Sequence, residues 1–146
     1  MNRNNIIKPT LLGLTALLLA TTTFAEEHKS GSADLSKLPP ASTKSGVTYA
    51  TDIKPIFEAS CIKCHGAEKP KAGLRLNSLE GALKGSKEGK VIEIGHSTKS
   101  SLVVSVACIS EDEDMWMPPK NNKAKIAPLT KDEVGLIRAW IDQGAK

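Results

Sequence analysis

Aromatic residues and cysteines are scarce in this sequence. Aromatic residues make up 3% of its 146 residues, which is thin for the core of a domain of this size. A buried group with a large, flat apolar surface would complete such a core. With only three cysteines, the chain has no second cysteine pair for a four-cysteine zinc site. The formal net charge of +4 includes two basic residues near the N-terminus, so charge gives no reason to expect a nucleic-acid partner.

The most informative stretch runs from Cys61 to Gly66 and reads C-x-x-C-H, the pattern of covalent haem attachment. The thiols of Cys61 and Cys64 are spaced to form thioethers with two vinyl groups on one porphyrin edge, and His65 follows directly as an iron ligand. A C-x-x-C pair also occurs in redox disulfides and in zinc sites. However, no βαβ pattern surrounds this pair, and the only other cysteine is Cys108. We therefore expect one covalently bound haem c per chain, which also supplies the missing flat apolar group.

Residues 1–25 have the three parts of a secretory signal peptide. Arg3 and Lys8 give a basic start, the run from Leu11 to Ala20 is apolar and uncharged, and Ala25 closes a small-x-small cleavage motif. The apolar run is too short to span about 30 Å of hydrocarbon, so we expect cleavage after Ala25 and no stable membrane insertion afterwards. Because c-type haem is attached outside the cytoplasm in bacteria, the expected location is the periplasm.

The segment 26–46 is rich in Ser, Lys, Ala and Pro and shows no apolar period. Such a composition buries too little surface to offset the entropy of ordering the chain, so it predicts a flexible linker. The folded domain is then expected over residues 47–146.

A helix is expected over residues 49–60, leading into the haem motif. Ile53, Ile56 and Phe57 are spaced i, i+3, i+4 and form one apolar stripe. Asp52 is the expected N-cap, which places a proline in the first turn.

The clearest helix begins at Thr130. Thr130 and Glu133 have the spacing of a capping box, and Gly144 gives the stop signal. Trp140 is the expected core anchor against the first helix and the haem. A shorter helix is expected over 101–107, capped by Ser100 or Ser101, although its β-branched residues also suit a strand.

Cys108 ends the apolar run of that shorter helix. The favoured interpretation is a small buried side chain in a monomer. The alternative is an exposed thiol that forms a disulfide-linked dimer in an oxidising compartment.

A second iron ligand is expected from Met117. A thioether sulfur is a soft ligand that suits haem iron opposite histidine, and the two prolines after Met117 hold its backbone. Met115 is the competitor. Between the motif and these methionines, Arg75 has two open interpretations, an ion pair with a haem propionate or a solvated side chain.

The chain resembles the planctomycete-type cytochrome c domain, within the monohaem c-type cytochromes. The resemblance covers nearly all of residues 47–146, and it is carried by the following stretches: Ile53–Phe57, Cys61–Gly66, Gly73–Leu76, Gly81–Gly85, Ser101-Leu102, Met117–Pro119 and Leu129–Ala145. It implies a small all-α domain in which N- and C-terminal helices pack around the haem. It also implies that Cys61 and Cys64 are the thioether sites, His65 the proximal ligand and Met117 the distal one. His96 stands where the family often has a different residue, which makes it an alternative sixth ligand.

These features predict a periplasmic electron carrier whose His/Met-ligated iron passes single electrons between redox partner proteins, with no enzymatic activity of its own. The alternative is a haem enzyme subunit or gas sensor with a labile sixth ligand. A basic rim of Lys69, Lys71, Arg75 and residues 120–125 is a candidate docking surface for acidic partners.

Overall fold

The computed structural model describes residues 33–146, and all regular structure in this range is helical. The predicted leader and the first part of the predicted linker lie outside the described residues. Within 33–146 there is no strand, and pairing between extended segments is limited to two isolated bridges, Ala33 with Ser110 and Ser86 with Gly89. This confirms the all-α class. The main helices are α1 (Lys54–Ser60), α2 (Ile62–His65), α3 (Leu79–Lys84), α4 (Ser101–Val106) and α5 (Lys131–Asp142).

Five short helical turns connect or precede these helices. They are η1 (Leu35–Lys37), η2 (Tyr49–Ile53), η3 (Lys71–Gly73), η4 (Ser97–Lys99) and η5 (Glu113–Met115). No helix among residues 33–146 has the length and apolar character that crossing a membrane requires.

The predicted helix over residues 49–60 forms as η2 followed directly by α1. Its cap differs from the prediction. Thr48 is the N-cap, and its hydroxyl accepts a hydrogen bond from the Thr51 N–H at 3.4 Å. Asp52 lies inside the first turn, where its carboxylate accepts a hydrogen bond from the Thr48 N–H at 3.0 Å. The helix begins at Tyr49, before its apolar stripe, so the Asp52 carboxylate reaches back to the start of the helix instead of capping from outside it.

Three aromatic side chains join the first helix to the last one. Trp140 of α5 is fully buried, and its ring centroid lies 6.0 Å from that of Tyr49 and 6.3 Å from that of Phe57. The ring of Phe57 meets that of Trp140 edge to face, which is a favourable geometry for aromatic pairs. The indole N–H of Trp140 donates to the carbonyl of Lys146 at 3.0 Å. Trp140 is therefore the predicted anchor between these two helices.

The start of α5 confirms the predicted capping box. The Glu133 N–H donates to the Thr130 hydroxyl at 3.2 Å, and the Thr130 N–H donates to the Glu133 carboxylate at 2.8 Å. Two of the backbone donors at the start of the helix are satisfied in this way.

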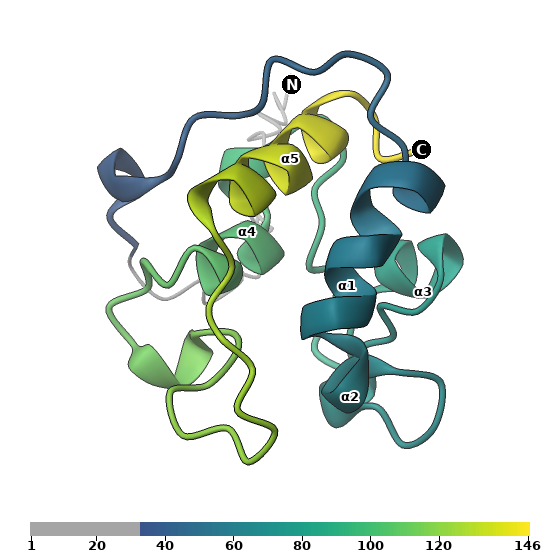
Figure 1. Cartoon of the computed structure of the whole chain (residues 1–146), viewed down its shortest axis with the longest axis vertical. Coiled ribbons are helices and arrows are strands. Elements are labelled where there is room, and N and C mark those ends of the chain that lie inside the picture. The colour runs from purple at the N-terminus through teal and green to yellow at the C-terminus, as the bar shows by residue number, and fades with distance from the viewer. Residues whose placement is uncertain (1–32) are drawn as a thin grey trace, which may run out of the picture.

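The segment from 38 to 46, here called the N-terminal strap, runs alongside α5 (Figure 1). The Ser42 N–H donates to the Gly135 carbonyl at 2.9 Å, and the Arg138 guanidinium donates to the Pro39 carbonyl. The Gln143 amide donates to the Lys44 carbonyl at 2.8 Å. The sequence suggested a flexible linker here, whereas these bonds hold its described part against α5.

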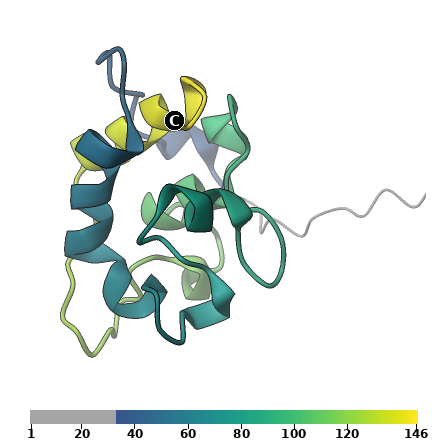
Figure 2. The same ribbon diagram turned by 90° about the vertical axis from the view of Figure 1, so that its right-hand side faces the viewer.

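The remaining elements surround the haem motif. In Figure 2, α1 and α5 lie along the left and top of the domain, and the loops that follow α2 fill its lower right. Leu74 and Leu76, in the loop after α2, are buried as predicted. The peptide of Leu76 is tied back to the motif, because its N–H donates to the His65 carbonyl at 2.7 Å.

Candidate functional site

The C-x-x-C-H motif lies at the junction of α1 and α2. The Cys61 N–H donates to the Phe57 carbonyl at 2.8 Å and ends α1, and the His65 N–H donates to the Cys61 carbonyl at 2.9 Å and closes the turn of α2. This single helical turn brings residues three and four apart onto one face, so Cys64 and His65 lie beside Cys61. All three cysteines of the chain are free thiols.

A cavity of about 650 Å³ opens against this face. Its volume falls within the range of about 300–1,000 Å³ typical of ligand and cofactor sites. Its walls come from α2, the loop after it, α4 and the segment 115–129. They are mainly aliphatic. The larger aliphatic residues that line the cavity are Leu74, Leu76, Val91, Leu102, Val104, Val106, Ile126 and Leu129. None of the Phe, Tyr or Trp residues in the described range 33–146 lines the cavity.

Burial changes the acid–base properties of the motif. It raises the pKa of the Cys61 thiol to about 12, with the neighbouring Cys64 thiol as a smaller cause. Burial also lowers the pKa of His65, and main-chain groups of Leu74 and Lys71 oppose this shift without cancelling it. The imidazole is therefore neutral at neutral pH, which is the form that ligates a metal.

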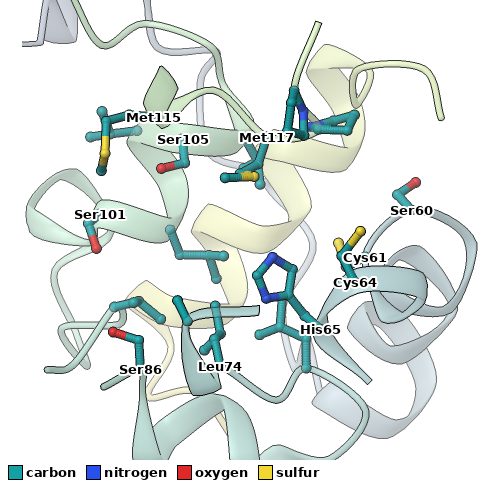
Figure 3. A pocket seen from close by; sticks show the side chains of 18 of the residues that line it. Ser60, Cys61, Cys64, His65, Leu74, Ser86, Ser101, Ser105, Met115 and Met117 are labelled. Carbon is teal, nitrogen blue, oxygen red and sulfur yellow. The ribbon is translucent and has the colours of Figure 1, made fainter. Parts of the chain in front are cut away.

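One nitrogen of His65 lacks a partner. Its Nδ1 is buried and forms no hydrogen bond within the described residues. Figure 3 shows the imidazole projecting into the cavity beside the sulfur atoms of Cys61 and Cys64. Two thiols, a neutral imidazole and an apolar cavity of this size fit a covalently held haem.

The two methionines predicted as alternatives both line this cavity. Met117 is half-buried against the hydrophobic core, and its N–H donates to the Ser105 carbonyl of α4 at 3.0 Å. In Figure 3 its side chain lies across the cavity from His65. Met115 is 40% exposed and lies toward the end of the cavity that is remote from the cysteines.

The other sequence candidates lie outside the cavity. His96 is exposed, and its Nδ1 is 3.2 Å from the Ile94 carbonyl. Arg75 is also exposed and does not line the cavity. Trp116, the residue between Met115 and Met117, does not line the cavity, and its indole N–H donates to the Ser110 carbonyl at 2.9 Å.

Several polar residues that line the cavity had no signal in the sequence. They are serines, one asparagine, one glutamate and one lysine, and they lie in loops or short helices: Ser60, Ser86, Glu88, Lys90, Ser101, Ser105, Ser110 and Asn122. Only the fold brings them to one cavity. Cys108 does not line the cavity; it is half-buried, with a positive φ of 53° and a thiol pKa that burial raises.

Residues 61–121 match the family model described as planctomycete cytochrome C. The match begins at the first cysteine of the motif and includes Met117, and it confirms the resemblance seen in the sequence. No curated protein matches the chain in sequence.

Among solved structures, the chain is similar to Kuenenia stuttgartiensis hydrazine synthase, with 24% sequence identity and a TM-score of 0.42. This similarity covers 68% of the present chain and 16% of the hydrazine synthase chain. The chain thus spans less than a fifth of that protein's length.

Proposed function

We propose, on the premise that residues 61–121 form a planctomycete-type c-type cytochrome, that this protein is an exported monohaem electron carrier. The observation that supports this best is the make-up of one cavity. The two thiols, the neutral imidazole of His65 and the thioether of Met117 all line it. A site with both axial positions filled by the protein exchanges electrons without binding a substrate.

The chain's own residues hold the haem and shield it. Each thiol adds across one vinyl double bond, with sulfur bonding to one carbon and the thiol hydrogen passing to the other, so no atom leaves. His65 and Met117 are the proposed ligands on the two sides. When bound, the haem supplies an iron that gains or loses one electron. The aliphatic walls around it exclude water, and the thioether ligand raises the reduction potential.

The main test is expression in a host competent for cytochrome c maturation. We expect a reduced absorbance spectrum of the c type, one haem per chain by pyridine haemochrome assay, and a haem stain that survives denaturing electrophoresis. Cys61→Ala with Cys64→Ala should abolish the stain. A colourless protein with two free thiols at these positions would refute the proposal.

The sixth ligand is tested by a matched pair of variants, Met117→Ala and Met115→Ala. Oxidised wild-type protein should show the weak long-wavelength charge-transfer band of an iron–methionine bond. Met117→Ala should lose this band, lower the reduction potential and bind cyanide readily, whereas Met115→Ala should retain the band. Loss of the band in Met115→Ala alone would assign the ligand to Met115. Absence of the band in wild type, together with ready binding of carbon monoxide, would favour the enzyme subunit or gas sensor.

Electron exchange with partner proteins is proposed to use the exposed basic rim. Lys69, Lys71 and Arg75 are exposed beside the loop after α2, and Lys120, Lys123 and Lys125 are exposed beyond Met117. Lys120 is partly neutralised by Glu113, whose carboxylate lies 2.7 Å from its ammonium group. A rim of this charge steers acidic partners and loses its effect as salt is added. Rates of stopped-flow reduction that do not change with ionic strength would exclude this docking mode.

A further inference from the structure

The two ends of the cavity have different chemistry. Cys61 and Cys64 lie at one end, where α1 meets α2, whereas Ser86 and Ser101 lie toward the opposite end in Figure 3. The vinyl and propionate groups of haem lie on opposite edges of the porphyrin. If the cysteines hold the vinyl edge, as the proposed function requires, the propionate edge faces the end with the serines.

Among residues 33–146, Lys90 is the only lysine or arginine that lines the cavity. Its neighbour Val91 is fastened to the start of α4, because the Leu102 N–H donates to the Val91 carbonyl at 3.0 Å. This bond places the Lys90 backbone next to Ser101, at the serine end. Among the described residues, no carboxylate lies within 4.0 Å of the Lys90 ammonium group, in contrast to the four ion-paired lysines of the domain.

The turn that carries Lys90 is tightly built. The Ser86 N–H donates to the Gly89 carbonyl at 2.8 Å, and the Gly89 N–H returns a bond to the Ser86 carbonyl at 3.3 Å. Gly85 precedes it with a φ of 87°, and a Cβ there would lie 2.4 Å from the Gly89 carbonyl oxygen and 2.8 Å from the Lys90 Cα. Glycine is therefore required for this close approach. The turn holds the Lys90 backbone in one place in the cavity wall, and the Lys90 side chain is exposed.

We infer that Lys90, with the Ser101 hydroxyl beside it, binds the haem propionates, and that it does so in place of Arg75. No hydrogen bond occupies the Ser101 hydroxyl within the described residues, whereas the Ser86 hydroxyl already donates to the Gly89 carbonyl at 3.2 Å. Within the described part of the chain, Glu88 is the one acidic residue that lines the cavity, and its negative charge opposes the positive charge of Lys90. His65 and the two cysteines are the other titratable groups of the lining, and they lie at the remote end.

The inference is tested by the pH dependence of the reduction potential in the mature, haem-bearing protein at low salt. A lysine beside a propionate lowers the pKa of that carboxyl group. In Lys90→Gln, the pH range over which the reduction potential changes should therefore move to higher pH by about one unit, which is a tenfold change in proton affinity. The reduction potential itself should become lower, because a positive charge is lost. Lys90→Arg should keep the wild-type profile. Glu88→Gln should shift the region in the opposite direction, because it removes a negative charge.

Lys87→Gln is the matched control. Lys87 belongs to the same turn and is exposed, but it does not line the cavity. If Lys90→Gln and Lys87→Gln gave the same pH dependence of the reduction potential, the assignment to Lys90 would be overturned, while the proposed function would stay intact. Wild-type protein without haem would overturn both. Arg75→Gln provides the direct comparison, and a larger shift in that variant would return the propionate site to Arg75.

Discussion

The Cys61 thiol is expected to react far more slowly in the folded chain without haem than in the unfolded chain. Burial raises its pKa from the usual 9.0 to about 12, a change of three units. Each unit reduces the thiolate fraction tenfold at neutral pH, and the thiolate is the nucleophile. The rate of alkylation should therefore fall by about a thousandfold on folding.

The assay uses a chain in which Cys108→Ala removes the distant thiol and Cys64 is kept, because the Cys64 thiol contributes to the raised pKa of Cys61. Fragment masses distinguish alkylation of Cys61 from alkylation of Cys64. Alkylation by iodoacetamide is followed by mass spectrometry in native buffer and in urea at the same pH, and circular dichroism verifies the helical content in native buffer. Raising the pH in native buffer should increase the rate tenfold per unit well beyond the pH at which the rate in urea levels off.

Equal rates in native buffer and in urea would contradict the burial of Cys61 on which this prediction rests.

Two further predictions concern the N-terminal strap and the start of the first helix. Gly135→Ala would place a Cβ 2.7 Å from the Pro40 carbonyl oxygen, so the strap must move and lose its hydrogen bonds to α5. Loss of the Ser42 and Arg138 bonds costs about 1–3 kcal/mol, whereas alanine gains about 1 kcal/mol over glycine in helix propensity. Urea denaturation should therefore show net destabilisation by roughly 1 kcal/mol. A stabilised variant would exclude the contact. Lys44 and the Thr48 N–H hold the pKa of Asp52 at about 2, below its usual 3.8, so its stabilising effect is present above pH 3.8 and is lost as the pH falls toward about 2. Asp52→Asn should flatten the acid side of the stability profile in this window, and an unchanged profile would show that the Lys44 pair contributes nothing.

Most of the local structure and half of the site follow from the sequence. The spacing of Cys61, Cys64 and His65 places them on one face once this segment is helical, because residues three and four apart share a face of a helix. The capping box of α5 is equally local, since both partners lie within four residues. The family match over 61–121 agrees with this part of the interpretation.

Contacts between distant segments could not be obtained in this way. The strap reads as disordered because it is polar and rich in proline, yet its backbone donors and acceptors find partners on α5, far away in sequence. The N-cap of the first helix moved from Asp52 to Thr48 because the helix begins earlier than its apolar stripe.

The sequence by itself determined that two thiols and an imidazole lie within five residues at the spacing of covalent haem attachment, a spacing that gives them one face once the segment is helical. Tertiary structure decided what else surrounds them. It brought Met117 and Met115 to the cavity, left His96 and Arg75 outside it, and placed Lys90 and Ser101 in its lining. The physical reason is that a cavity wall is assembled from segments whose separation along the chain carries no periodic signal, so only their packing shows which side chains it contains.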